Sequence, residues 1–337
     1  MTGLLIAYAI GAVLLGAELF TNALEHLGAR FHVSEGVTVS VFAAVATAMP
    51  EASIPVIAIL EHAGTGAIRE QVATGAILGA PLMLSTVAFL VMGIAAAWKR
   101  GARSPLCPEP QGLRRDLLWF TASFSLAALA TLLPGDASLL RGVVAALLVI
   151  LYARYLRVTI RASTALVAAG HGTRVVRPLH VARLKRFSSG PSGIALQLLS
   201  GFFLIVLGTR AFLDVVAGLS TRFPPLALSL MIIPIATELP EKVNSVLWIR
   251  RGGQDTLAFG NISGALVFQG TLLPALGIWL TPWTVRPDVL LSIALTLIAT
   301  AYVLVMHIRG VLRPYHLLFN GACYVIYPLF LTHAFGF

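Results

Sequence analysis

Long apolar segments alternate with short polar ones along the whole chain. An α-helix needs about 20 predominantly apolar residues to cross the hydrocarbon core of a membrane, and these segments have that length. The first starts at the N-terminus without a basic stretch before it, so we interpret it as a true span rather than a signal peptide. The pattern predicts ten membrane-spanning helices, at about residues 2–24, 36–60, 71–98, 116–134, 138–158, 193–217, 224–249, 255–280, 287–307 and 315–335.

The composition agrees with a membrane protein and excludes several soluble classes. Hydrophobic residues make up 58% of the 337 residues and charged residues only 11%, whereas soluble domains carry about a quarter charged residues. Soluble enzymes and DNA-binding proteins are excluded because the chain cannot supply a charged surface. The two cysteines, Cys107 and Cys323, are far apart and imply neither a disulfide framework nor a zinc site. We therefore expect an all-α polytopic membrane protein.

The basic residues are distributed unequally between the two sides of the predicted membrane domain. The loops and adjoining span ends on one side hold eighteen Lys and Arg, and those on the other side hold four. By the positive-inside rule the basic side faces the cytoplasm, so both termini are expected outside it. We predict an integral protein of the plasma (inner) membrane that contacts membrane lipid and has no nucleic-acid partner.

A basic polar segment at 159–192 divides the ten predicted spans into two halves of five, 1–158 and 193–337. We interpret this segment as a solvated cytoplasmic loop, with binding to anionic lipid or a regulatory role as alternatives. Halves with an odd number of spans lie in opposite orientations, so similarity between them predicts an inverted repeat. Such similarity is present: Ala46-Thr47-Ala48-Met49-Pro50-Glu51 matches Ala236-Thr237-Glu238-Leu239-Pro240-Glu241.

Glu51 and Glu241 are each about 15 residues into their spans, near the middle of the membrane. A carboxylate at that depth generally faces a cavity, a partner or an ion. Each follows a proline, which leaves a helix carbonyl without its usual partner, and carboxylate and carbonyl oxygens together suit a hard cation. A single such motif is equally compatible with a kinked helix and a protonated glutamate. Its recurrence in both halves favours a cation site at the midplane.

These motifs resemble the α-repeats of the calcium/cation antiporter superfamily, the sodium/calcium exchanger-like membrane proteins. In that family each repeat carries Gly-Thr-Ser-x-Pro-Glu on one helix and Gly-Asn-x-x-Gly-Ser-Asn-x-x-Asn (or Asp) on the next. The resemblance covers essentially the whole chain and implies that Glu51 and Glu241 are the central calcium ligands. It further implies oxygen ligands from Thr47, Thr237, Ser245, Asn261 and Gln269.

The chain departs from the family pattern mainly in its first half. Ala48 stands at the serine position after the threonine, Pro55 replaces a serine, and Leu84 takes the terminal Asn/Asp position. In the second half Glu238 takes the serine position and Gln269 the terminal one. Because sodium sites in this family depend on the missing hydroxyl and amide groups, the resemblance implies weakened sodium coupling and favours protons.

Lys242 directly follows the second glutamate, where its ammonium would compete with a bound cation. Three alternatives are open: an i,i+4 ion pair with Glu238, extension toward the cytoplasmic surface near Arg250, or occupation of the cation position itself. In either of the first two, Glu238 and Lys242 would modulate the site. Glu18 and Arg210 occupy corresponding positions in the two halves, and we expect them to form a gating pair.

The sequence thus predicts a secondary active antiporter, without a cofactor and without enzymatic activity, that exchanges Ca²⁺ for Na⁺ or H⁺ by alternating access around two glutamates. One alternative is a non-transporting or proton-coupled relative whose cation site is altered by Lys242. Another is an intramembrane enzyme with two carboxylates as acid and base, which no nucleophile or metal motif supports.

Overall fold

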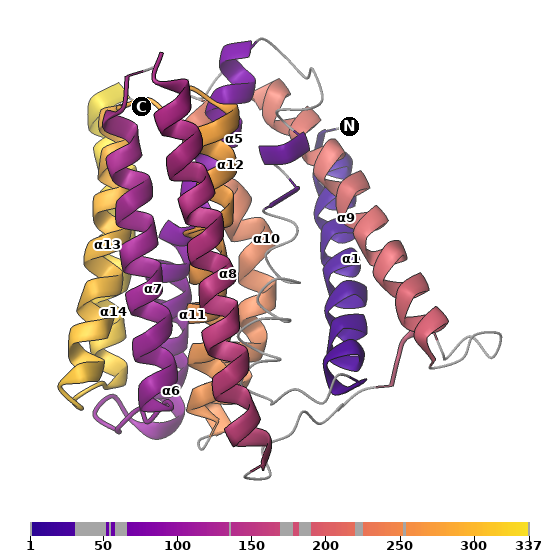
Figure 1. Ribbon diagram of the computed structural model, residues 1–337, viewed down its shortest axis with the longest axis vertical. Coiled ribbons are helices and arrows are strands. Elements are labelled where there is room, and N and C mark those ends of the chain that lie inside the picture. Colours follow the sequence, from indigo (N-terminus) through magenta and orange to yellow (C-terminus); the bar gives the residue numbers. More distant parts are fainter. Residues whose placement is uncertain are drawn as a thin grey trace.

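The computed structural model describes residues 2–30, 52–53, 55–57, 66–134, 136–168, 178–181, 190–219, 225–251 and 254–335. Within these ranges the regular structure is entirely helical (Figure 1). The long elements are α1 (Thr2–Arg30), α5 (Gly66–Met83), α6 (Phe89–Arg100), α7 (Pro110–Leu129), α8 (Ser138–Ala168), α9 (Pro191–Leu219), α10 (Pro225–Arg251), α11 (Asp255–Gln269), α12 (Leu272–Leu280), α13 (Pro287–Ile308) and α14 (Pro314–Phe335).

Five helical segments of the described part are long and apolar enough to cross a membrane, so the chain is an integral membrane protein. Every predicted span except 36–60 coincides with described helix, and that span lies mostly outside the described residues. The boundaries differ most for α8, which continues to Ala168, ten residues past the predicted end at 158. The first part of the predicted cytoplasmic loop is therefore helical.

Proline marks the start of several helices. Proline is favoured at the first helical position because its missing N–H would lack a partner there and its fixed φ suits the helix. Glu109 additionally caps α7, because its carboxylate accepts hydrogen bonds from the backbone N–H groups of Gln111 and Gly112. The helices that begin in this way are α7, α9, α10, α13 and α14.

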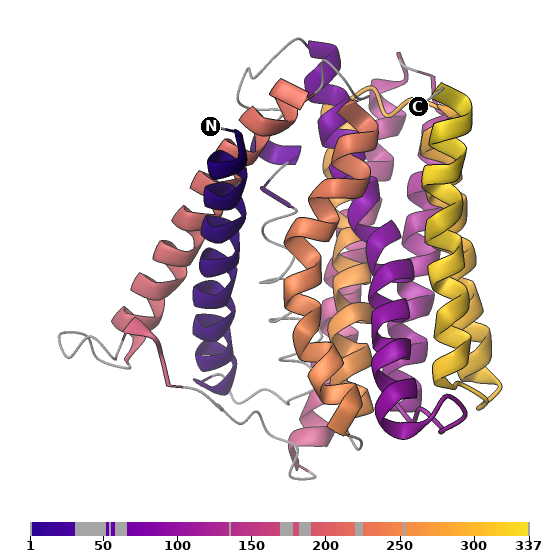
Figure 2. The same ribbon diagram turned by 180° about the vertical axis from the view of Figure 1, so that it is seen from behind.

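The helices form two groups (Figures 1 and 2), and α1 and α9 both contact the second group at α10. The first group is the pair α1 and α9, and the second is the bundle formed by α5 to α8 and α10 to α14. Within the pair, glycines bring the two backbones together. A Cβ on Gly16 would lie 2.7 Å from the carbonyl oxygen of Gly201, and one on Gly208 would lie 2.8 Å from that of Ala9. These contacts make α1 and α9 antiparallel.

Glycines also allow the backbones of α5 and α10 to approach each other closely. A Cβ on Gly75 would lie 2.7 Å from the carbonyl oxygen of Leu226, and one on Gly79 would collide with the backbone of Leu230. Close packing of this kind through small residues is typical of membrane helices. It fixes α10, which carries the second Pro-Glu motif, against the interior of the bundle.

A short π-helical turn, Leu84–Ala88, joins α5 to α6. Such turns leave backbone carbonyls without their usual helical partners. The side-chain amide of Asn320 on α14 donates to the carbonyl oxygens of Ser85 at 2.7 Å and Ala299 at 3.1 Å. The irregular turn is thereby joined to α13 and α14 by a buried asparagine.

Part of the basic 159–192 segment packs against the α1–α9 pair. Leu179 is fully buried against Ala23 and Ile194. The backbone N–H of His180 donates to Asn22 at 3.2 Å, and that of Val181 donates to Gln197 at 2.9 Å. The expectation of a solvated loop is therefore wrong for residues 179–181, because an apolar side chain and two polar anchors hold this stretch on the helices.

Candidate cation-binding site

The predicted site falls on α10 and α11 wherever the structure describes it. The side chains of Glu238, Lys242, Ser245, Asn261 and Gln269 are all buried in the bundle. Thr237 and Glu241 lie in α10, but their side chains are outside the described part. Thr47 and Glu51 lie outside the described residues altogether. The second half of the predicted site can therefore be built from its residues, and the first half stays a prediction.

Glu238 and Lys242 form a buried ion pair on α10. The ammonium nitrogen of Lys242 lies 3.1 Å from Oε2 of Glu238, with side-chain exposures of 1% and 0%. The spacing of four residues places both on one face of the helix, with the acid first. Of the three sequence alternatives, extension to the cytoplasmic surface is the one that this burial does not allow. The pair adds one negative and one positive charge, so its own net charge is zero.

Gln269 at the end of α11 completes this pair from the neighbouring helix. Its Nε2 donates a hydrogen bond to Oε1 of Glu238. The carboxylate acceptor fixes the orientation of the amide, since the reverse orientation would face two oxygens toward each other. Oε1 of Gln269 is buried and has no hydrogen-bond partner among the described residues. Glu238 is thus held between an ammonium and an amide, and a carbonyl-type oxygen is left beside it.

A second contact joins the two helices further along. Nδ2 of Asn261 on α11 donates to Oγ of Ser245 on α10 at 2.9 Å. Ser245 is four residues after Glu241, about 6 Å along the helix axis. The Asn261 and Gln269 side chains therefore contact α10 on both sides of the level of Glu241. The two residues that the family resemblance pointed to on α11 lie together with the α10 motif.

The opposite face of α11 is held by a buried carboxylate that the sequence analysis did not single out. Oδ2 of Asp116 on α7 accepts from Ser263 at 2.8 Å, and Oδ1 accepts from the hydroxyl of Tyr155 on α8 at 3.1 Å. The guanidinium of Arg115 lies 3.3 Å from the same carboxylate. An acidic residue at the start of a predicted span was the available signal. Asp116 positions α11 through the face that points away from α10. Among the described residues, it makes no hydrogen bond to the polar residues of α10.

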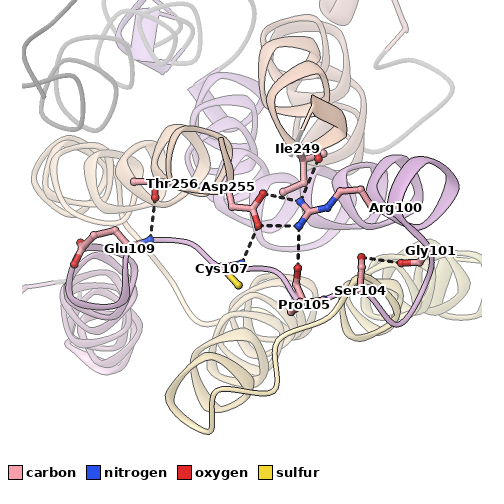
Figure 3. Close-up of polar contacts among 9 residues, drawn as sticks. All are labelled: Arg100, Gly101, Ser104, Pro105, Cys107, Glu109, Ile249, Asp255 and Thr256. Atoms are coloured by element: carbon pink, nitrogen blue, oxygen red, sulfur yellow. Dashed lines mark hydrogen bonds and ion pairs between the residues drawn. The ribbon is translucent and has the colours of Figure 1, made fainter. Parts of the chain in front are cut away.

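A polar cluster closes the end of the bundle opposite the two termini (Figure 3). The guanidinium of Arg100, at the end of α6, lies 2.6 and 3.3 Å from the carboxylate oxygens of Asp255, the first residue of α11. Arg100 also donates to the carbonyl oxygens of Ile249 and Pro105, and the backbone N–H of Cys107 donates to Asp255 at 2.8 Å. One arginine thus ties together α6, its following loop, and the ends of α10 and α11.

The residues just after Glu51 contact the α1–α9 pair. The hydroxyl groups of Ser53 and Thr209 lie 2.8 Å apart, and both side chains are buried. Ser53 is two residues from Glu51 in the sequence, and Thr209 follows the glycine of α9 that packs on Ala9. Ser53, just beyond the first glutamate motif, therefore lies against α9.

The sequence comparison suggested that Glu18 and Arg210 lie opposite each other. In the structure they lie at different levels along the α1–α9 pair. Glu18 lies near Gly201, because Gly201 packs against Gly16 and Phe20. Arg210 is nine residues further along α9, about 13 Å at 1.5 Å per residue. A twofold axis in the membrane plane sets corresponding residues on opposite sides of the midplane, so only residues near the axis meet. Among the described contacts, Oε1 of Glu18 lies 3.2 Å from Nε2 of His180.

The described residues contain no group of three or more His, Cys, Asp or Glu side chains that could hold a metal ion. This result leaves aside the side chain of Glu241 and all of Glu51.

Comparisons with known proteins agree with this architecture. The model of the sodium/calcium exchanger protein family matches residues 2–161 and 193–336. Among solved structures, the H⁺/Ca²⁺ exchanger CAX matches with a TM-score of 0.75 and 15% identity, over 97% of this chain and 82% of that one. The sodium-calcium exchanger NCX_Mj matches with a TM-score of 0.61 and 16% identity, over 97% and 98% of the two chains.

A comparison with curated protein sequences gives no match. At these identities the structural matches show a shared fold. The family match rests on the sequence itself, and it covers most of both halves on either side of the basic segment. On that evidence the chain belongs to the sodium/calcium exchanger protein family.

Proposed function

We propose that this protein is a secondary active cation antiporter that exchanges Ca²⁺ for Na⁺ or H⁺ around Glu51 and Glu241. The observation that carries the proposal is the buried polar site on α10 and α11. Ser245, Asn261 and Gln269 are at most 3% exposed inside an apolar bundle, and a membrane protein places such groups at depth where an ion or substrate passes. The ligand set of the proposal is Glu51, Glu241, Thr47, Thr237, Gln269, Asn261 and Ser245.

Ten spans in two inverted repeats are part of this proposal. The glycine contacts of the α1–α9 pair support it, because they are reciprocal. Gly16 of the first half packs on Gly201 and Ile205 of the second, and its counterpart Gly208 packs on Ala9 and Val13 of the first. A twofold axis between the halves predicts such an exchange. The distribution of Lys and Arg places both termini outside the cytoplasm, in the plasma (inner) membrane.

Alternating access needs one part of the molecule to move against another. The α1–α9 pair is suited to this role, since its two helices pack closely on each other and contact the bundle mainly at α10. The bundle holds α10 and α11 in place through Asp116 and through the Arg100–Asp255 pair. Sliding of the pair over the α10 face would expose the site to each side in turn.

The counter-ion follows from the ligands that the chain retains. The first half lacks most of the hydroxyl and amide groups on which sodium sites of the family depend, which favours H⁺ over Na⁺. Both exchange reactions occur among the structural matches, one named an H⁺/Ca²⁺ exchanger and the other a sodium-calcium exchanger. A non-transporting relative is the remaining alternative, because Lys242 introduces a positive charge beside Glu241.

The test is calcium uptake into liposomes that contain the purified protein, driven in turn by sodium, potassium and proton gradients. The proposal expects uptake under a sodium or proton gradient, and none in empty liposomes. Folded protein that takes up no calcium under any gradient would contradict it. If the protein transports another cation instead, the antiporter proposal stands and the proposed ion, Ca²⁺, is wrong.

A further inference from the structure

We propose that the ammonium of Lys242 is a built-in cation, which takes a position beside Glu238 that a free sodium or potassium ion would otherwise occupy. The inference rests on the proposed function in that it treats Glu241 as a ligand of the transported ion. It makes Lys242 a specificity-determining residue, because a charge fixed to the protein cannot be exchanged across the membrane.

A single positive charge already lies beside the carboxylate of Glu238. The carboxylate is completely buried, and an ammonium lies 3.1 Å from Oε2. A lysine ammonium is a compact, single positive charge that interacts with oxygen atoms from several directions. An alkali ion likewise carries one positive charge and binds to carboxylate and carbonyl oxygens. Either positive charge would neutralise the carboxylate of Glu238. The alkali ion can dissociate from the protein, whereas the lysine ammonium cannot.

The second contact of Glu238 comes from the neighbouring helix. Gln269 presents its N–H group, a donor, to Oε1 of Glu238. The other oxygen of that carboxylate faces Lys242. Oε1 of Gln269 is buried without a hydrogen-bond partner among the described residues. If the ammonium were absent, Glu238 and Gln269 would offer two oxygens of the type that alkali cations bind.

The charge balance links this pair to the transported ion. Glu238 and Lys242 cancel, so the negative charge that remains on this stretch of α10 is that of Glu241. Together with Glu51 it gives a charge near −2, which a single Ca²⁺ neutralises. Without Lys242 the same site would carry a third negative charge, and neutrality inside the membrane would need one more monovalent cation.

The test measures monovalent cation binding directly, in three forms of the detergent-purified full-length protein. These are the wild type, Lys242→Met and the double variant Glu238→Gln/Lys242→Met. Radioactive sodium binding and melting temperature are recorded over a range of sodium and of potassium concentrations, with choline chloride keeping the ionic strength constant. Lys242→Gln serves as a second single variant in case the methionine form does not fold.

We expect Lys242→Met to bind one more monovalent ion per molecule than the wild type, and its melting temperature to rise with sodium or potassium concentration, because a ligand of the folded state stabilises it. The double variant, which removes both charges, should bind no more ions than the wild type. Equal ion binding in the wild type and both single variants would overturn the inference, as would an extra ion in the double variant.

This readout does not need calcium transport. A wild type that moves no calcium would contradict the proposed function and leave the sodium-binding comparison to decide the role of Lys242. A wild type that exchanges calcium, together with a Lys242→Met form that gains no ion, would contradict only the inference about Lys242.

Discussion

Gln269 at the end of α11 donates a side-chain hydrogen bond to Glu238 on α10, a residue already paired with Lys242. The contact fixes the distance between the two helices at the level of the Pro-Glu motif. It also uses the amide nitrogen of Gln269 and leaves the amide oxygen for another partner. Gln269 thus occupies the terminal Asn/Asp position of the family motif. Its amide nitrogen binds Glu238, which stands at the family's serine position, and its amide oxygen is left for another partner.

Removal of this donor should destabilise the protein. In Gln269→Leu the buried Glu238 loses a hydrogen bond to a charged group, and such bonds contribute about 1.5–3 kcal/mol. We expect a loss of that order, visible as a lower melting temperature in detergent. Ser200→Ala is the control, because Ser200 is only partly buried and its hydroxyl bonds to its own helix at Leu196. Equal melting temperatures for Gln269→Leu and the wild type would contradict the role assigned to Gln269.

The glycines between α5 and α10 allow a matched comparison. Gly79→Ala would force a Cβ against the backbone of Leu230, and overpacking of this kind costs about 1–3 kcal/mol. At Gly142 in α8 a Cβ meets nothing within 4 Å, so Gly142→Ala should stabilise the helix by about 0.5–1 kcal/mol. Melting temperatures of the two variants should therefore move in opposite directions. A shift of the same sign and size would refute the close packing of α5 on α10.

The Arg100–Asp255 pair should contribute more than an exposed ion pair, since Asp255 is 4% exposed and Arg100 makes two further backbone contacts. We expect Arg100→Ala to reduce stability by about 2 kcal/mol, discounted from the value for fully buried pairs because the guanidinium is partly exposed. Arg103→Ala, in the same loop and exposed, should have little effect. A double-mutant cycle with Asp255→Asn measures the coupling, and additive effects would show that the pair does not act as a unit.

The attachment of residues 179–181 to the α1–α9 pair can be tested by limited proteolysis. Gln197 bonds to the backbone of Val181, to Leu19 and to Asn22. Gln197→Leu removes these bonds and should release the segment, so trypsin should cleave faster at the basic positions between 174 and 186. Ser200→Ala, three residues after Gln197 in α9, again serves as the control and gives the reference rate of cleavage. Unchanged cleavage in Gln197→Leu would mean that Leu179 and the His180–Asn22 bond hold the segment without Gln197.

The helices follow closely from the sequence, because a membrane span needs a long apolar segment and leaves little choice of secondary structure. The predicted spans at 193–217 and 287–307 differ from α9 and α13 by at most two residues at either end. The Glu238–Lys242 pair could likewise be expected, since helical spacing alone brings residues four apart to the same face. Both are local properties of the chain.

Long-range polar contacts could not be predicted in this way. Arg100 and Asp255 are 155 residues apart, and Asp116 meets Ser263 across 147 residues. Composition marks residues 178–181 as part of a basic loop, yet burial of Leu179 depends on the surface that α1 and α9 present together. The expected Glu18–Arg210 pair shows the same limit, because aligning two halves does not show on which side of the symmetry axis each residue lies.

The central claim is that Glu51 and Glu241 bind the transported ion together. Its most direct test is calcium uptake by liposomes that contain the wild type, Glu51→Gln or Glu241→Gln, under the gradient that drives the wild type. Asp136→Asn, at an exposed position between α7 and α8, is the matched control for loss of a carboxylate. The account predicts that uptake is lost in both glutamate variants and retained in the control. Uptake that persists in either glutamate variant, from folded protein, would contradict it.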